Sequence, residues 1–323
     1  MIEDTNLFKY ELAVVAIMKN EAPYVKEWVD YHLLAGVDHF YIYDNDSEDN
    51  LKDVLQPYID KGMVDYEFIT GKCAQMLVYN EAAQKYKFDC RYIAFIDADE
   101  FIFPKDNKSI VEVLHEVLDN KPFAGGLAIN WHTFASGGNE KADLTKGVIE
   151  RFKYRAEDKF EANKNGGNAH VKVIVNPRII NYMSIPHNFN YFLGMYTVDE
   201  NGKIIVGYFN ADVPDKKIII NHYFTKSKEE YANKVKRGNA DCAVNVYKIS
   251  VLETADKAST IYDDSITKYI DVRKNIYTER KTDLMEINKR RFNTVFNILA
   301  PIAMFTNLSM QLLKSAPPPV FFK

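Results

Sequence analysis

The chain has 323 residues, with 41 lysines and arginines against 45 aspartates and glutamates, so its formal net charge is −4. Apolar residues make up 47% and charged residues 27%, which is ordinary for a globular protein and excludes disorder as the dominant state. A mildly acidic chain lacks the basic footprint of a general nucleic-acid binder, so we expect no nucleic-acid partner.

The cysteines and the apolar runs indicate the cellular compartment in which the protein is expected. Cys73, Cys90 and Cys242 are widely spaced and odd in number, which argues against a disulfide framework or a zinc site. A reducing compartment is the simplest interpretation. No signal-peptide pattern opens the sequence, and no uncharged apolar run reaches the roughly 18 residues of a membrane span. We therefore expect a cytoplasmic protein.

The first hundred residues alternate between strand and helix patterns. A continuous apolar run at residues 12–18 predicts a strand buried on both faces, and the helical pattern after it ends at Gly36. Further strands are predicted at 39–43, 63–69 and 91–97, with helices beginning near Glu48 and spanning 75–85. This rhythm predicts an α/β, Rossmann-like, mainly parallel sheet with helices on both faces. Ligands of such sheets bind beyond the carboxyl ends of the strands.

After about residue 124 the pattern changes to strands with long connections. Strands are predicted at 127–131, 147–154, 170–175 and 217–224. The glycine- and asparagine-rich stretches 136–139 and 163–168 predict mobile surface loops. A capping box at 227–230 predicts a helix that ends near Gly238. The composition is helical from residue 251, so we expect a catalytic domain at 1–250 and a helical extension at 251–323.

An acidic cluster follows the predicted strand at 91–97. Asp97 and Asp99 are two residues apart, so in an extended segment their carboxylates project to the same side. Two such groups repel unless a cation lies between them or one is protonated. Mg²⁺ or Mn²⁺ suits these oxygens and also binds phosphate oxygens. A solvated acidic turn is the competing interpretation.

Several blocks of the sequence resemble a known class. Residues 14–21, 41–47 and 95–101 resemble the opening blocks of family 2-type glycosyltransferases with the GT-A fold. Later blocks, at 130–137, 146–152, 171–177, 186–187 and 221–238, resemble glycosyltransferase family 92 and related bacterial surface-polysaccharide transferases. The resemblance covers roughly residues 10–240 and leaves the tail uncovered.

This resemblance implies an inverting transfer of a hexose from a nucleotide sugar, UDP-linked by preference, to a hydroxyl of a glycan or a lipid-linked glycan. It also implies Mn²⁺ or Mg²⁺, with Asp99 as principal ligand and Asp97 facing the metal or the ribose. The remaining donor-site residues that it implies are Ala16, Lys19, Glu21 and Asp44 around the nucleoside, and Lys172 and Arg237 at the diphosphate.

Other site residues are less sharply defined. His222 ends an apolar strand and is the candidate third metal ligand, with His187 as its competitor. Glu150 is the candidate catalytic base, because an inverting transfer needs a group that takes the proton of the acceptor hydroxyl. The pair Glu157–Asp158 and the loop residues Asp143 and Glu140 are the alternatives. Trp131 and His132 are expected to line the acceptor site, and core packing is the alternative for Trp131.

The tail predicts a separate feature. Residues 289–313 begin with a basic cluster and continue as an apolar stretch broken at Pro301. Such a segment can lie in the interface of an anionic membrane, which would place the protein at the inner face of the cell membrane. A helix packed on the domain or a contact in a homo-oligomer is the competing interpretation.

Two rival functions remain open at this stage. A nucleotide-sugar- or glycan-binding protein without catalysis would have the same donor site. Because the sequence shows no clear catalytic base, this rival stays open. A nucleotidyltransferase would share the sheet and the metal. It usually has a glycine-rich basic loop after the first strand, and residues 19–23 contain no glycine.

Overall fold

The computed structural model describes residues 7–161, 167–238 and 248–276. One compact unit spans Met1–Arg273, and the second unit, Lys274–Lys323, is described only at residues 274–276. The predicted membrane-interfacial stretch at 289–313 therefore lies outside the described residues. Among the helices that the structure describes, none has the length and apolar content needed to cross a membrane. The proposed domain boundary near residue 250 stays a prediction.

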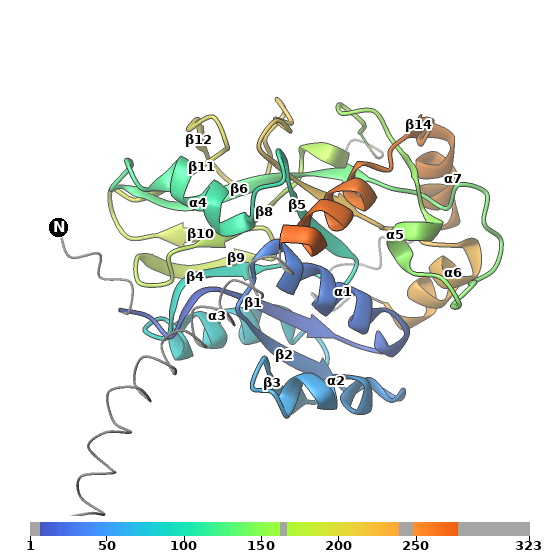
Figure 1. Cartoon of the computed structure of the whole chain (residues 1–323), viewed down its shortest axis with the longest axis horizontal. Coiled ribbons are helices and arrows are strands. Elements are labelled where there is room, and N and C mark those ends of the chain that lie inside the picture. Colours follow the sequence, from blue (N-terminus) through green and yellow to red (C-terminus); the bar gives the residue numbers. More distant parts are fainter. Residues whose placement is uncertain (1–6, 162–166, 239–247, 277–323) are drawn as a thin grey trace, which may run out of the picture. The chain divides into compact units, whose positions relative to one another are not determined.

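A ten-stranded sheet organises the described part of the unit Met1–Arg273 (Figure 1). Its strands are β1 (Tyr10–Met18), β2 (His39–Asn45), β3 (Val64–Ile69), β4 (Cys90–Phe95), β5 (Glu100–Pro104), β6 (Ala124–Thr133), β8 (Val171–Val175), β11 (Tyr196–Val198), β12 (Ile204–Ile205) and β13 (Ile218–His222). The path runs β12-β11-β6-β8-β4-β1-β2-β3, and β13 joins β6 to β5. Two small sheets pair β9 (Ile180–Ile185) with β10 (Asn188–Tyr191), and β7 (Tyr154–Arg155) with β14 (Ile261–Tyr262).

The helices are as follows: α1 (Ala22–Ala35), α2 (Leu51–Ile59), α3 (Gln75–Lys85), α4 (Ile110–Leu118), α5 (Val148–Arg151), α6 (Lys228–Arg237) and α7 (Ile249–Ala258), with a 3₁₀ turn η1 at Gly167–Ala169. Residues 265–276 are also helical. The strands β1, β2, β3 and β4 pair in parallel, and β8 lies antiparallel between β4 and β6. The predicted α/β class is confirmed.

Strand β1 separates two hydrophobic cores, as its continuous apolar sequence predicts. Leu12 and Val14 face a core shared with α1, α2 and α4, whereas Ala13 and Val15 face a core shared with α3 and the β9–β10 pair. Successive side chains of a strand point to opposite faces, so a strand buried on both sides needs apolar residues at every position. Helices therefore cover both faces of the sheet, as predicted.

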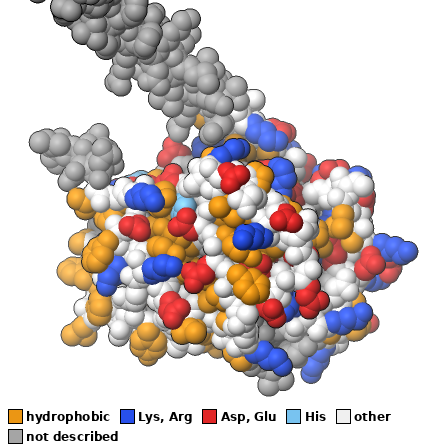
Figure 2. All heavy atoms as spheres, turned by 90° about the horizontal axis from the view of Figure 1, so that it is seen from below, with side chains coloured by type: hydrophobic (Ala, Val, Ile, Leu, Met, Phe, Trp, Pro, Cys, Tyr) orange, Lys and Arg blue, Asp and Glu red, His pale blue; other side chains and the backbone are white. Residues whose placement is uncertain are grey.

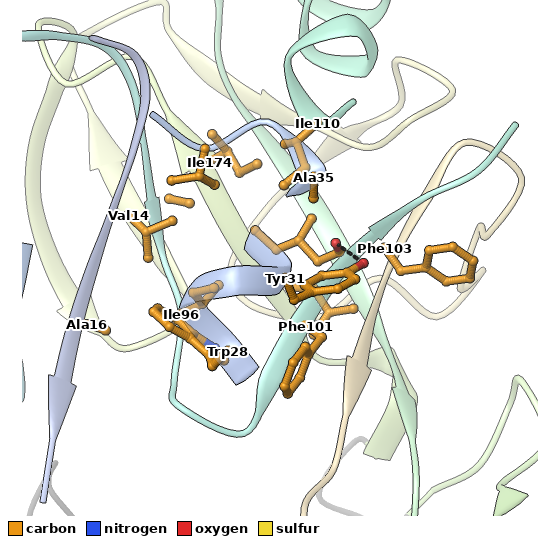
Figure 3. Packing of buried hydrophobic residues seen from close by; sticks show 14 of the residues in the cluster. Val14, Ala16, Trp28, Tyr31, Ala35, Ile96, Phe101, Phe103, Ile110 and Ile174 are labelled. Atoms are coloured by element: carbon orange, nitrogen blue, oxygen red, sulfur yellow. Dashed lines mark hydrogen bonds between the residues drawn. The ribbon is translucent and has the colours of Figure 1, made fainter. Parts of the chain in front are cut away.

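Aromatic residues of α1 hold β5 from the core side (Figure 3). The Trp28 indole N–H donates to the carbonyl oxygen of Glu100 at 2.8 Å, and the Tyr31 hydroxyl donates to the carbonyl oxygen of Ile102 at 2.9 Å. The buried His32 accepts from the Ile102 N–H at 3.2 Å through Nε2. These bonds fix the start of β5 and hence the acidic turn before it.

The predicted strand at 147–154 is wrong, because residues 148–151 form the helix α5 and only Tyr154 enters a strand. The half-buried Glu27 of α1 accepts hydrogen bonds from the Val148 and Ile149 N–H groups, one at each carboxylate oxygen. A carboxylate at the first turn satisfies N–H groups that have no partner within the helix and favours its dipole. Because Glu27 is more than 100 residues away in sequence, local pattern could not reveal this cap.

Two expectations about loops and cysteines also change. Gly137 and Gly138 are exposed as predicted for a surface loop, but Ser136 is fully buried and donates through its N–H and hydroxyl to Asp256, each at 2.8 Å. Of the second predicted loop, 163–168, the structure describes only residues 167 and 168. Both are buried in the 3₁₀ turn η1, so the prediction of a surface loop is wrong there. Cys90 is free and buried, whereas Cys73 is disulfide-bonded. Wide spacing in sequence was therefore a wrong argument against a disulfide.

Candidate active site

The acidic turn between β4 and β5 lies at the carboxyl end of β4. Glu100 is fully buried and closes the turn, because its Oε2 accepts a hydrogen bond from the Asp97 N–H at 2.9 Å. Burial raises the pKa of Glu100 to about 8, against the opposing effect of the Lys172 ammonium 3.7 Å away. Glu100, the third carboxyl group of the turn, thus holds the turn in shape. The other two carboxylates, of Asp97 and Asp99, face other elements.

Asp97 is held by side chains from α3 and β8. The Lys172 ammonium donates to Oδ2 at 2.8 Å, and the Gln75 amide donates to Oδ1 at 3.0 Å. Lys172 is only 1% exposed, and although burial disfavours its charge, Asp97 and Glu100 raise its pKa above the usual range. A fully charged lysine therefore lies beside Asp97, as the sequence-based assignment of Lys172 to the donor site requires.

Asp99 is buried between β13 and α6. The Lys234 ammonium donates to Oδ2 at 2.6 Å, and His222 Nε2 lies 3.6 Å from Oδ1. Burial alone would raise the pKa of Asp99, but the Lys234 and His222 side chains hold it well below its usual range. The Tyr223 N–H also donates to the Asp99 carbonyl oxygen at 2.9 Å, which ties the turn to the end of β13.

The three predicted metal ligands meet only in part. The 3.6 Å between Asp99 Oδ1 and His222 Nε2 is somewhat longer than the roughly 3 Å between neighbouring ligand atoms of one octahedral Mg²⁺ or Mn²⁺, so a small approach of the two groups would let them hold one ion. His222 Nδ1 is buried without a hydrogen-bond partner in the described structure. Asp97 faces Lys172 instead, and the ligand atoms of Asp97, Asp99 and His222 do not all come within 4.8 Å of one another. The Asp99–His222 pair fits a divalent cation, and Asp97 would join it only by leaving Lys172.

The ends of β1 and β2 carry the remaining predicted donor residues. Glu21 is buried and pairs with Arg237 of α6 at 2.7 Å and with Lys226 at 3.5 Å. Arg237 also donates to the Lys19 carbonyl oxygen, so α6 is fastened to the end of β1. Lys19 itself lies 3.6 Å from Asp46. The predicted residues Lys19, Glu21 and Arg237 are therefore neighbours.

Asp44 and Ala16 occupy less accessible positions. Asp44 is buried at the end of β2, where it accepts from the Ser47 N–H at 2.9 Å and from the Tyr66 hydroxyl at 2.7 Å. Ala16 is fully buried in β1 and pairs with Ile42. Asp44 thus shapes the turn after β2, whereas Ala16 packs in the hydrophobic core that β1 shares with α1.

Trp131 and His132 are neighbours in β6 but face opposite sides of the sheet. The Trp131 ring stacks on His170 with centroids 4.9 Å apart and lies 4.4 Å from the His222 ring, so it belongs to the Asp99 side. His187, the competitor of His222, contacts Trp131 edge-on at 5.4 Å. Burial, with Lys172 nearby, holds the pKa of His187 well below its usual range.

His132 is almost fully buried on the other face. Its Nε2 lies 3.4 Å from Asp158 and 3.6 Å from Asp215. Burial, with Arg155 and Lys105, lowers the pKa of His132 to about 4. His132 and Trp131 therefore do not line one surface.

Glu150, the predicted catalytic base, lies on α5 with its side chain 61% exposed, 3.9 Å from Lys146. The next residue, Arg151, makes a bidentate pair with Glu230 of α6 at 2.8 and 3.0 Å. The structure thus links the α5 helix to α6 through Arg151, and it records no contact between Glu150 and the acidic turn among the described residues.

Four residues of the site were missed by sequence reasoning: Gln75, His170, Lys226 and Lys234. Lys234 had a local signal, because it lies three residues before Arg237 and so shares a face of the capped helix α6. Lys226 has a left-handed backbone (φ 52°), which is costly for a residue with a side chain and is often found at functional sites. Gln75 and His170 gave no sequence signal that sets them apart from ordinary polar residues.

The chain belongs to glycosyltransferase family 92, because the model of that family matches residues 14–246. A family 92 protein of Oryza sativa subsp. japonica is 26% identical over 211 residues, which cover 63% of this chain and 34% of the rice protein. A galactan β-1,4-galactosyltransferase of Arabidopsis thaliana, GALS3, is 25% identical over 142 residues, 41% of this chain and 28% of that protein. The chain thus spans about a third of the length of these curated relatives. They are plant proteins and do not support the resemblance to bacterial surface-polysaccharide transferases.

Solved structures resemble the chain more remotely. The Staphylococcus aureus TarS fragment 1–349 is 13% identical, covers 76% of this chain and 70% of its own, and has a TM-score of 0.37. The same fragment in complex with UDP has a TM-score of 0.34 over 52% of this chain and 47% of its own.

Proposed function

We propose that this chain transfers a hexose from a nucleotide sugar to a hydroxyl of a glycan or a lipid-linked glycan, with a UDP-linked donor and inversion at the anomeric carbon. The observation that carries the proposal is the meeting of the aspartates of the acidic turn with buried lysines from β8 and α6. The pairs are Asp97 with Lys172 at 2.8 Å and Asp99 with Lys234 at 2.6 Å. This arrangement lies where ligands of α/β sheets bind.

The cations of the site suit a diphosphate leaving group. Lys172, Lys226 and Lys234 have side chains between 1% and 14% exposed, so their charges act in a medium that screens them poorly. Each is paired with a carboxylate, which keeps it charged and positioned without a substrate. Fixed positive charges that need no reorganisation stabilise the charge that develops on a departing group. A nucleoside diphosphate is such a group.

A divalent cation fits beside the lysines. Asp99 Oδ1 and His222 Nε2 would hold it, and as a Lewis acid it would supply further charge stabilisation to the diphosphate. Lys234 would meanwhile keep Asp99 ionised through the other carboxylate oxygen, and Trp131 would keep the imidazole of His222 in place. We propose Mn²⁺ or Mg²⁺ in this position.

The acceptor side is proposed to use Trp131 and Glu150. Sugars pack on aromatic faces, and Trp131 lies against His222 on the same side of the sheet as Asp99. Glu150 would take the proton of the acceptor hydroxyl. Glu150→Gln tests this role, because it keeps the size of the side chain and removes its basicity. A loss in kcat of about 100-fold or more supports the role, and an unchanged kcat refutes it without affecting the donor site.

A transfer assay with and without Mn²⁺ tests the whole proposal. UDP-galactose is the first donor to try, because an Arabidopsis relative is named a galactan β-1,4-galactosyltransferase. We expect metal-dependent release of UDP by the wild-type chain and its loss in Asp99→Asn, whereas the matched exposed variant Asp60→Asn keeps it. Donor binding without turnover by the wild-type chain would favour the rival, a binding protein that does not catalyse transfer.

A further inference from the structure

A second group of possible ligands lies on the face of β6 that carries His132. His132 belongs to β6, Asp158 follows β7, and Asp215 precedes β13. His132 Nε2 lies 3.4 Å from Asp158 Oδ1 and 3.6 Å from Asp215 Oδ2, and the three ligand atoms all lie within 4.8 Å of one another. No other group of three such residues meets this criterion in the part of the chain that the structure describes. We refer to these three residues as the His132 cluster.

The imidazole at the centre of this cluster has no hydrogen-bond partner. His132 is 1% exposed, and neither of its ring nitrogens makes a hydrogen bond in the described structure. Buried polar atoms are almost always satisfied, so each exception needs an explanation. Here the unsatisfied Nε2 points between two carboxylates that approach it from different loops, at distances too long for good hydrogen bonds.

The spacing of the three atoms fits a metal ion better than a hydrogen bond. Zinc binds imidazole nitrogen and carboxylate oxygen at about 2.0–2.2 Å with tetrahedral geometry, which places neighbouring ligand atoms about 3.4 Å apart. The two measured separations from Nε2, 3.4 and 3.6 Å, agree with this value. One nitrogen ligand and two oxygens also suit zinc better than magnesium, which prefers six oxygen ligands.

We propose that His132, Asp158 and Asp215 bind a zinc-class divalent cation, with water as the fourth ligand. The site is separate from the Asp99–His222 pair and does not depend on the proposed transferase function. The cation would connect the loop after β7 to the loop before β13 through the buried strand β6. Because these loops come from distant parts of the chain, the binding free energy would contribute to folding.

The charges around the cluster allow this occupant. The Arg155 guanidinium donates to Asp158 Oδ1, the oxygen that faces His132, at 2.8 Å and to Asp263 at 2.9 Å, so its charge is shared with a carboxylate outside the cluster. Hydrogen bonds of this kind orient carboxylates that bind metals. Lys216, 3.1 Å from Asp215, is 89% exposed and can turn into solvent. Lys105 is the other cation near His132, and the negative charges of Asp215 and Asp263 offset its positive charge.

Zinc titration of the purified full chain, stripped of metal with a chelator, tests the proposal. The titration uses the Asp99→Asn variant, so that binding at the Asp99–His222 pair does not contribute. We expect one equivalent of zinc to bind in isothermal titration calorimetry, and the melting temperature to rise with zinc. His132→Ala and Asp215→Asn in the same background should weaken zinc binding at least about 10-fold.

Asp212→Asn is the matched control, because Asp212 lies in the same loop as Asp215, with its side chain 66% exposed and paired with Lys203. It should bind zinc like its parent. Asp215 is 19% exposed in a loop, so Asp215→Asn carries the test if His132→Ala fails to fold. The proposal is overturned if the Asp99→Asn chain binds no zinc, or if Asp215→Asn binds zinc as tightly as Asp212→Asn does.

Discussion

The acidic turn after β4 and the cations that meet it have different origins in the sequence. The turn supplies its carboxylates from a single stretch of four residues, 97–100. Its partners come from far along the chain, since Lys172 is 75 residues from Asp97 and Lys234 is 135 residues from Asp99. The carboxylates can thus be recognised as a motif, whereas the cations are brought to it by the topology of β8 and α6.

The two regions also differ in what they need from the rest of the fold. The turn is closed locally by Glu100, and the α1 aromatic residues, with Trp28 72 residues from Glu100, support it from behind β5. Lys172 is held in the middle of the sheet, and Lys234 depends on a helix that is fastened at both ends, through Ser227 and Arg237. Figure 2 shows a contrasting face, on which acidic and basic side chains are interspersed among hydrophobic ones. Loss of a buried cation should therefore cost far more than loss of a surface one.

Lys172→Met gives the largest expected effect. It leaves the buried Glu100 and the partly exposed Asp97 beside an apolar side chain. Breaking a fully buried ion pair costs about 3–5 kcal/mol, and because the Asp97 side chain is 37% exposed we expect a loss at the lower end of this range. Urea unfolding measures this loss. Lys216→Met removes a lysine whose side chain is 89% exposed, and it should change stability by less than about 0.5 kcal/mol. Equal effects of the two substitutions would contradict the account of Lys172.

Lys234→Met should lower transfer activity about 10–100-fold, because it removes the cation that holds Asp99 ionised and in position. Lys236→Met removes an exposed charge from the same helix and serves as the control. Steady-state kinetics with a saturating acceptor measures both variants. If Lys236→Met impairs activity as much as Lys234→Met, only the net charge of α6 matters and the pair with Asp99 does not.

Acid should destabilise the α1 side of the acidic turn. Burial lowers the pKa of His32 to about 3, below its ordinary value of 6.5. The unfolded chain therefore binds the proton more readily, so the contribution of His32 is complete above pH 6.5 and is lost as the pH falls from there towards 3. The loss between pH 7 and pH 5 is roughly 2 kcal/mol. Urea unfolding of the wild-type chain and of His32→Gln at the two pH values measures this loss as the difference between them, because His132 and Glu100 titrate in both chains. His115→Asn, which changes a residue away from this contact, should leave the wild-type pH dependence in place.

The two capping boxes offer the smallest and most closely matched test. Ser109 caps α4 and Ser227 caps α6, each with a glutamate three residues on. Either serine-to-alanine change should cost about 1 kcal/mol of stability. Ser227→Ala should in addition raise KM for the donor, because α6 carries Lys234 and Arg237, whereas Ser109→Ala should not. Equal kinetics in the two variants would show that the position of α6 does not limit donor binding.

The sequence correctly predicts those elements whose structure depends on residues close together in the chain. The double-sided apolar run of β1, the helix α3 at Gln75–Lys85 and the Ser227 cap all appear where the sequence places them. The predicted residues Lys172, Asp97, Asp99, His222 and Arg237 also lie at the ends of the expected strands or on the expected helix. Each of these predictions rests on residues close together in sequence or on a resemblance that covers them.

Long-range contacts account for what was missed. Helix α5 depends on a cap from Glu27, and the buried position of Ser136 depends on Asp256, so neither follows from local composition. The strands β9 to β12 are short and lie between loops, where periodicity has few residues to act on. Trp131 and His132 were both assigned to the acceptor site because sugars stack on aromatic rings, although adjacent residues of a strand face opposite sides.

Calorimetric titration of UDP into the wild-type chain and Asp99→Asn, each with Mn²⁺ and with a chelator, shows whether Asp99 and a divalent cation bind the diphosphate together. We expect the wild-type chain to bind UDP more tightly with Mn²⁺, and Asp99→Asn to lose this gain while its folded state persists. A wild-type chain that binds no UDP under either condition, or an Asp99→Asn chain that keeps the full gain from Mn²⁺, would show that Asp99 holds no cation at the donor site.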